Sequence, residues 1–172
     1  EKISQYGREH YADCGTTMTA ILLYNNHYAT VNVGDSRIYK LTSKGIEQLT
    51  HDQSVVQQLL DSGQITAEEA ETHPQRSVLL QCVGIGERAV PDFTFGSYEE
   101  GDVFFACSDG FRHQLTAEEM YQVLYINRKE DIKDIEGVDE LKKDLINRLD
   151  YLIKVVKERG ERDNITVVAC SM

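Results

Sequence analysis

Residues 16–50 contain runs of β-branched and apolar residues, and in one run apolar and polar residues alternate, which is typical of half-buried β-strands. The run His-Tyr-Ala-Thr-Val-Asn-Val at 27–33 shows this alternation over its whole length. Turn-forming residues interrupt the pattern at Asn25-Asn26, at Gly34-Asp35 and at Ser43-Lys44-Gly45. We therefore expect an antiparallel meander of four strands, at residues 16–24, 27–33, 36–42 and 46–50.

Helical spacing replaces the alternation at Asp52. Apolar residues recur three and four positions apart until Ser62-Gly63, where the pattern stops. Thr66-Ala67-Glu68-Glu69 then forms a capping box, which opens a second short helix that ends before Pro74. Two short helices inserted between strands predict a flap at about residues 52–76, not a layer of the core.

Strand and helix patterns alternate through the rest of the chain. Thr116-Ala117-Glu118-Glu119 is a further capping box and begins a helix that runs to about Tyr125. Residues 139–158 give the strongest helical pattern, because their apolar residues form one stripe, and the charged residues 127–138 predict a surface loop. Strands separated by such helices predict one α+β domain over residues 1–172. The further predicted strands are 77–83, 92–98, 103–107 and 164–171.

Charge and composition narrow the possible partners. The 172 residues carry a formal net charge of −11, which disfavours binding to nucleic acid or to anionic lipid. No apolar run approaches membrane-spanning length, no signal peptide is visible, and the cysteines lack C-x-x-C spacing, so we expect a cytoplasmic protein. The chain begins at Glu1 on what resembles the end of a helix, which predicts that it is part of a longer protein.

Two distant segments each place an aspartate at the end of a predicted strand. Asp109 follows the run 103–107, and Asp163 lies shortly before the final strand. If these two strands are antiparallel neighbours, both carboxylates emerge at the same end of a sheet, where they suit a hard divalent cation. The alternative is that Ser-Asp-Gly and Asp-Asn are ordinary turns, which are common uses of both sequences.

Other polar motifs give weaker signals. Gly34-Asp35-Ser36-Arg37 is typical of a tight hairpin with a capping aspartate, and His51-Asp52 is typical of a helix cap. No G-x-x-x-x-G-K, G-x-G-x-x-G, G-x-S-x-G or H-E-x-x-H pattern is present. A nucleotide cradle and a serine hydrolase therefore have no support.

Six motifs follow one another along the chain. They are Cys14-Gly15-Thr16-Thr17, Val33-Gly34-Asp35-Ser36-Arg37, Leu49-Thr50-His51-Asp52, His73-Pro74-Gln75-Arg76, Cys107-Ser108-Asp109-Gly110 and Arg162-Asp163-Asn164-Ile165-Thr166-Val167. Any one motif alone is unspecific, whereas six in this order are specific. Their order resembles that of PPM-type (type 2C) metal-dependent serine/threonine protein phosphatases of the bacterial kind, over their carboxy-terminal two-thirds.

The resemblance implies a fold and a set of metal ligands. The fold would be an α-β-β-α sandwich of two antiparallel sheets flanked by helices, incomplete at its amino-terminal side. The metal-binding aspartates would be Asp109 and Asp163, and Asp52 would hold a third, weaker ion together with Asp109. The cofactors would be two Mn²⁺ or Mg²⁺ ions, with a third where Asp52 contributes. The helices between Ser54 and His73 would be the variable flap of the family.

The resemblance also implies the reaction and its partners. A binuclear metal centre would activate a water that hydrolyses phosphoserine or phosphothreonine in protein substrates, in opposition to a serine/threonine kinase. The phosphate-binding arginine and the bridging aspartate of the family belong to its amino-terminal third, so neither is in this chain, and its own catalytic residues stay unassigned. Without that third we expect unpaired sheet edges that favour self-association.

Departures from the family pattern leave two other interpretations open. Gln81-Cys82-Val83-Gly84 and Phe111-Arg112-His113 differ from the sequences usual in the family, which bears on substrate preference. One alternative is a catalytically inactive pseudo-phosphatase or regulatory binding module of the same fold. The other is a structural β-rich interaction domain without metal.

Overall fold

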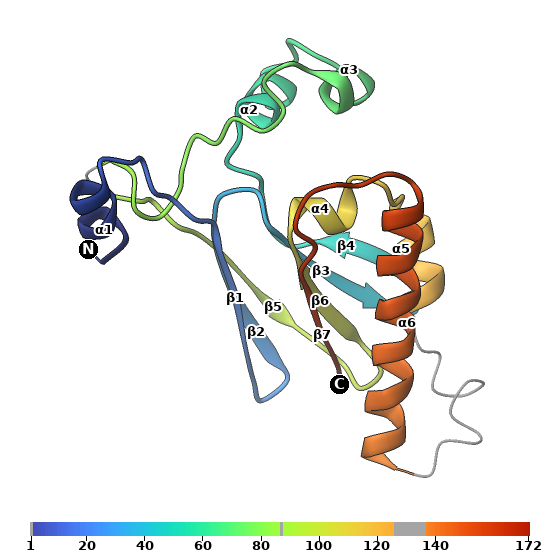
Figure 1. Ribbon diagram of the computed structural model, residues 1–172. Helices are drawn as coiled ribbons and strands as arrows, with labels where there is room; N and C mark the ends of the chain where they lie inside the picture. Colours follow the sequence, from blue (N-terminus) through green and yellow to red (C-terminus); the bar gives the residue numbers. More distant parts are fainter. Residues whose placement is uncertain (1, 87, 126–136) are drawn as a thin grey trace.

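The computed structural model describes residues 2–86, 88–125 and 137–172, and these form two antiparallel sheets with helices beside them (Figure 1). The first sheet has the strand order β1-β2-β5 and the second the order β4-β3-β6-β7. The strands of the first sheet are β1 (Met18–Tyr24), β2 (His27–Val33) and β5 (Asp92–Ser97). Those of the second are β3 (Arg37–Thr42), β4 (Gly45–Gln48), β6 (Val103–Cys107) and β7 (Val167–Ser171).

The predicted four-stranded meander is wrong, because the chain changes sheets between β2 and β3. β1 and β2 form one hairpin and β3 and β4 another, each in a different sheet. Gly34 permits the crossing: its φ is +107°, and a Cβ there would lie 2.5 Å from Cγ2 of Thr17. The sequence correctly predicted both hairpins but not which sheet each one joins.

The predicted strand at residues 77–83 is also absent. This segment forms only two isolated bridges, between Leu79 and Ser54 and between Val83 and Thr16. Because its two partners lie in different parts of the chain, its β-branched and apolar residues make an extended connection and no continuous ladder.

Six described helices accompany the sheets, and both predicted capping boxes are confirmed. Thr66 and Glu69 cap the second short helix of residues 52–76, and Thr116 and Glu119 cap the helix that follows β6. Among the described residues, no helix is long and apolar enough to cross a membrane. Most of the predicted surface loop at 127–138 lies outside the described residues. The helices are α1 (Lys2–His10), α2 (Val55–Asp61), α3 (Ala67–Thr72), α4 (Asp109–Arg112), α5 (Ala117–Leu124) and α6 (Val138–Glu158).

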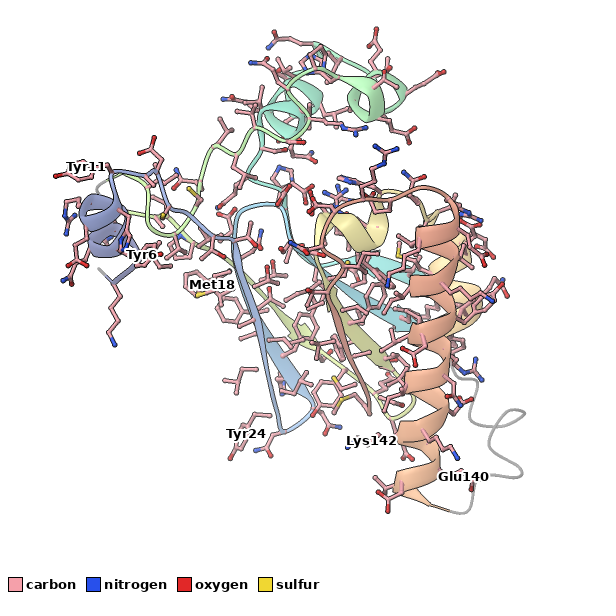
Figure 2. All side chains as sticks on the ribbon, viewed as in Figure 1. Tyr6, Tyr11, Met18, Tyr24, Glu140 and Lys142 are labelled. Carbon is pink, nitrogen blue, oxygen red and sulfur yellow. The ribbon has the colours of Figure 1, made fainter. Side chains whose placement is uncertain are left out.

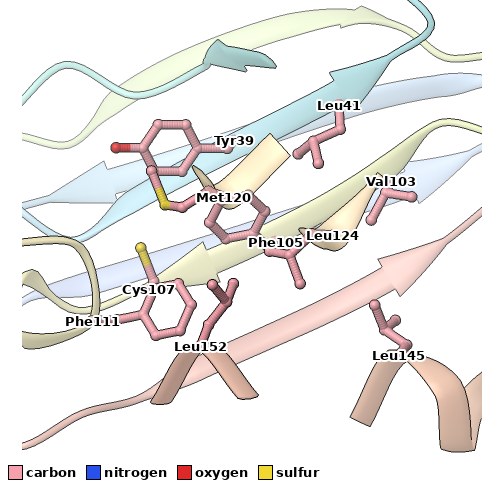
Figure 3. Packing of buried hydrophobic residues seen from close by; sticks show 10 residues of the cluster. All are labelled: Tyr39, Leu41, Val103, Phe105, Cys107, Phe111, Met120, Leu124, Leu145 and Leu152. Carbon is pink, nitrogen blue, oxygen red and sulfur yellow. The ribbon is translucent and has the colours of Figure 1, made fainter. Parts of the chain in front are cut away.

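Strand β6 is buried on both faces, because one face packs against the first sheet and the other against the helices. Phe104 contributes to a cluster between the two sheets, together with Tyr28 and Ile38. Phe105 points the other way, into a larger cluster beneath α5 and α6 that includes Leu152 (Figure 3). Burying each such side chain contributes about 1.5–3 kcal/mol to folding. The predicted α+β architecture of two antiparallel sheets with flanking helices is confirmed.

The outer face of the first sheet is apolar and exposed. Leu22 of β1 and Phe95 of β5 are 67% and 72% exposed, and both pair across Ala29 of β2. Met18 and Tyr24 continue the exposed row along β1 (Figure 2). No helix of the described residues covers this face, whereas α6 covers the second sheet (Figure 1).

Candidate metal centre

The two aspartate motifs lie at the same end of the second sheet, as their sequence context predicts. β6 and β7 pair antiparallel, with Cys107 opposite Val167. The segment that follows β6 and the segment that precedes β7 therefore meet at the same end of the second sheet. Figure 1 shows α4 and the loop before β7 at this end of the sheet, with α2 and α3 beyond it.

Asp109 is fixed by the turn that begins α4. The Ser108 amide donates to the carbonyl of Thr166 at 3.0 Å, and the Thr166 amide donates to the Ser108 hydroxyl at 3.1 Å. The Gly110 amide donates to Oδ1 of Asp109 at 2.8 Å. Phe111, two residues after Asp109, is fully buried in the cluster beneath α6 and anchors the turn there. The aspartate is thus held on a rigid element.

Asp163 lies in the loop between α6 and β7. Its amide donates to a carboxylate oxygen of Glu161 at 3.0 Å, and its Oδ1 accepts from the Asn164 amide at 2.7 Å. A Cβ added to Gly110 would lie 2.5 Å from the Asn164 carbonyl oxygen and 3.3 Å from Cβ of Asp163. The two aspartate-bearing turns are therefore packed directly against each other, and only a glycine permits this approach.

Asp52 occupies a different environment from the other two aspartates. It is buried before α2 and forms ion pairs with Arg37 and Arg112. Its carboxylate is therefore already surrounded by positive charge. Arg37 belongs to the motif that sequence analysis interpreted as a hairpin, and Arg112 comes from α4, 60 residues further along the chain.

Asp35 joins this charged cluster, although its sequence indicated only a turn cap. Burial raises the pKa of the Asp35 carboxyl, the negative charges of Asp109 and Asp52 raise it further, and Arg112 lowers it. Asp35 is placed there by the crossing between the sheets. In the sequence its motif interrupts a strand pattern and is one of the six motifs that resemble the family, but neither observation assigned a role to the carboxylate.

The donor chemistry fits hard divalent cations only in part. Asp109 and Asp163 supply carboxylate oxygens, the ligands that Mg²⁺ and Mn²⁺ prefer. Within residues 2–86, 88–125 and 137–172, however, no three His, Cys, Asp or Glu side chains converge into a ready-made cation site. The two carboxylates would thus need ligands beyond those that the described residues bring together.

Comparison with known proteins identifies the family, although no family model matches the chain. The chain is 34% identical over 173 residues to "Protein phosphatase PhpP" of Streptococcus pneumoniae, which covers the whole chain. The crystal structure of the Mycobacterium tuberculosis serine/threonine phosphatase PstP/Ppp matches 99% of the chain with a TM-score of 0.82 and 31% identity. This chain belongs to the PPM-type serine/threonine protein phosphatases of the bacterial kind.

Two further facts qualify the PPM match. A structure of the catalytic domain of PstP in complex with two manganese ions matches 99% of the chain, with a TM-score of 0.79 and 28% identity. The chain spans 64% of the length of PhpP and 66% of the PstP/Ppp chain. Asp109 and Asp163 as metal ligands, and Asp52 as the ligand of a third ion, stay predictions.

Proposed function

We propose that the whole protein hydrolyses phosphoserine and phosphothreonine in protein substrates, and that this chain contributes Asp109 and Asp163 to its binuclear metal centre. The direct packing of the two aspartate-bearing turns at Gly110 is the observation that carries the proposal. The two manganese ions bound by the related PstP domain support two ions here. Mn²⁺ and Mg²⁺ are equally suited to the carboxylate oxygens.

The residues of this chain position the reaction. Divalent ions at such a centre supply Lewis-acid activation of a water for in-line attack on phosphorus. Asp109 and Asp163 would hold the ions, and the buried Phe111 and the Ser108–Thr166 hydrogen bonds keep the two aspartate-bearing turns against each other. The phosphate-binding arginine and the bridging aspartate would come from outside these 172 residues.

The substrates and the setting are part of the same proposal. A serine/threonine phosphatase acts on phosphorylated proteins and so opposes a serine/threonine kinase. The segment at residues 52–76, with α2 and α3 beyond the candidate metal centre, would be the flap beside the bound substrate (Figure 1). The cytoplasm remains the expected location.

Substitution of the two aspartates tests the proposal. Asp109→Asn and Asp163→Asn in the full-length protein should each lower Mn²⁺-dependent hydrolysis of a phosphothreonine peptide by at least about 100-fold, because a lost carboxylate weakens the hold on an ion that must stabilise the transition state. Asp150→Asn, an exposed position on α6, is the matched control and should retain the full rate.

The competing interpretations give different results in the same assay. A pseudo-phosphatase would bind Mn²⁺ without measurable turnover by the wild-type protein. A structural domain would bind no Mn²⁺ at all. The isolated 172-residue chain should turn over far more slowly than the full-length protein, and an equal rate would show that the catalytic groups are misplaced here.

A further inference from the structure

Arg112 joins α4 to two other segments of the chain. It lies three residues after Asp109 in α4, and its Nη2 donates to Oδ2 of Asp52 at 3.2 Å. The same Nη2 lies 3.5 Å from the carbonyl oxygen of Asp35. Asp35 belongs to the crossing between the two sheets, and Asp52 begins the segment at residues 52–76. One guanidinium group therefore connects α4 to both the crossing and the start of that segment.

These contacts support the side of α4 that other contacts leave free. α4 has only four residues, and so short a helix does not hold its own geometry. The buried Phe111 and the Ser108–Thr166 hydrogen bonds fasten the turn to the cluster beneath α6 and to the segment before β7. β6 lies between β3 and β7 in the second sheet, and the crossing leads into β3. Arg112 therefore holds the turn on its β3 side.

The charge of Arg112 also matters, because three carboxylates belong to the same cluster. Arg112 opposes the mutual repulsion of the Asp35 and Asp109 carboxylates, since it lowers the pKa of Asp35 that burial and Asp109 raise. The third carboxylate is Asp52, which also accepts hydrogen bonds from Arg37 on both of its oxygens. With all groups ionised, three carboxylates and two guanidinium groups leave one negative charge in excess. Without Arg112 the excess would grow, in a place where burial limits screening by solvent.

The stability of the fold does not by itself explain this arginine. Its side chain is 14% exposed, and its buried Nε has no hydrogen-bond partner among the described residues. Leaving a buried donor unpaired costs free energy, so the guanidinium group is not placed for the best hydrogen bonding. Its position instead matches the need for a positive charge between α4 and the crossing.

We propose that Arg112 is a positioning residue of the phosphatase reaction. Its Nη2 contacts hold the Asp109 turn against the crossing, and its charge offsets the repulsion among the three carboxylates of the cluster. Arg112 acts through Asp109 and not on the substrate itself. The kinetic consequence rests on the proposed function, whereas the role in holding the turn does not.

The kinetics of p-nitrophenyl phosphate hydrolysis test the kinetic consequence. In the full-length protein at saturating Mn²⁺, Arg112→Ala should lower kcat by at least about 10-fold and change KM less, because a displaced Asp109 misplaces an ion but leaves the substrate contacts in place. Arg112→Lys keeps the charge and should retain more of the rate. Equal kcat values for Arg112→Ala and an active wild type would overturn the inference, whereas a wild type without turnover would contradict the proposed function.

Rescue by guanidinium separates this role from a merely structural one. A cavity of about 310 Å³ borders Arg112, Arg37 and Tyr39, so a guanidinium ion can enter once the Arg112 side chain is removed. Guanidinium chloride below denaturing concentrations should restore part of the kcat of Arg112→Ala. Urea has the same shape without the charge and should restore nothing, as should sodium chloride at equal ionic strength. Equal effects of guanidinium and urea on kcat would overturn the role of the positive charge.

Amide exchange in EDTA tests the holding of the turn without metal or substrate. The His113 amide donates to the Asp109 carbonyl at 3.0 Å and reports on α4. Arg112→Met, which is uncharged and of similar length, should accelerate exchange in α4 by at least about 10-fold. Arg148→Met is the matched control, because it removes a 25% exposed arginine that pairs with Asp144, and it should leave α4 unchanged. Unchanged exchange in α4 of Arg112→Met would overturn the inference, whatever the kinetics show.

Discussion

Single residues set the spacing of the candidate metal centre, and Gly110 is the most restrictive of them. The neighbouring turn approaches so closely that a Cβ at this position would collide with the Asn164 carbonyl oxygen at 2.5 Å. Real Cβ atoms essentially never approach a backbone oxygen so closely, so a side chain here must displace one turn from the other.

Gly110→Ala should therefore weaken metal binding more than it weakens the fold. We expect the affinity for Mn²⁺ to fall at least about 10-fold, because displacing one turn moves the Asp109 and Asp163 carboxylates out of the arrangement that would bind the same pair of ions. Calorimetric titration of the folded variant measures the affinity, and thermal unfolding in EDTA measures its stability. An unchanged affinity would mean that Asp109 and Asp163 do not act on the same ion pair.

Residue types alone indicated part of this site. The placement of Asp109 and Asp163 at one end of the sheet could be predicted, because each stands next to a strand-like run and β6 pairs antiparallel with β7; their role as metal ligands stays a prediction. The cluster of Asp35, Arg37, Asp52 and Arg112 could not be predicted, because its members come from three separate segments of the chain. A local sequence pattern does not predict which distant arginine will form an ion pair with a buried carboxylate.

At the scale of elements, Glu119 joins the start of α5 to the end of α6. It accepts hydrogen bonds from the amide and hydroxyl of Thr116, and Arg159 donates to both of its carboxylate oxygens. The Arg159 hydrogen bonds and the Thr116 amide hold the pKa of Glu119 at about 2, below its usual value of 4.5. Because the folded-state pKa is depressed, this contribution to stability is present above about pH 4.5 and is lost as the pH falls towards 2.

Glu119→Gln should consequently reduce stability at pH 7 and make no difference near pH 2. Urea unfolding of the variant and the wild type across pH 2–7 measures this difference. Glu118→Gln removes the same charge from the same turn but leaves the Arg159 contact in place, so it should change stability less. Equal effects of the two substitutions would show that the contact with α6 contributes nothing.

The elements also show which predictions a sequence supports. The helix caps at Thr66 and Thr116 were predictable, because each cap uses residues within three positions of each other. Sheet membership was not, because β3 pairs with β6, more than 60 residues away, and not with β2. Residues 77–83 have the composition of a strand but form only isolated bridges with other segments. Their β-propensity predicted a strand, but no neighbouring strand pairs with them over their length.

At the scale of the whole molecule, the two sheets differ in what covers them. α6 buries the outer face of the second sheet, whereas Leu22, Phe93 and Phe95 are exposed on the first. A contiguous apolar face of this kind favours association when it meets water. The exposed face is the physical reason to expect that this chain, produced alone, does not stay monomeric.

Leu22→Gln with Phe95→Gln should therefore increase the monomer fraction of the isolated chain. Sedimentation velocity over a range of protein concentrations measures this fraction. Val78→Gln, an exposed apolar position outside both sheets, is the control and should leave association unchanged. Association that persists in the double variant would point to the strand edges instead of the sheet face.

The pairing of β6 with β7 also has a consequence for how the protein is made. A growing chain that has been synthesised only as far as α6 already contains Asp109, but the turn that carries Asp163 has not yet been made. The two aspartate-bearing turns come together only after β7 has joined β6 across the intervening residues 108–166. Under the proposed function, divalent ions would bind only at the end of folding, and a partly translated protein would have no activity towards phosphorylated targets.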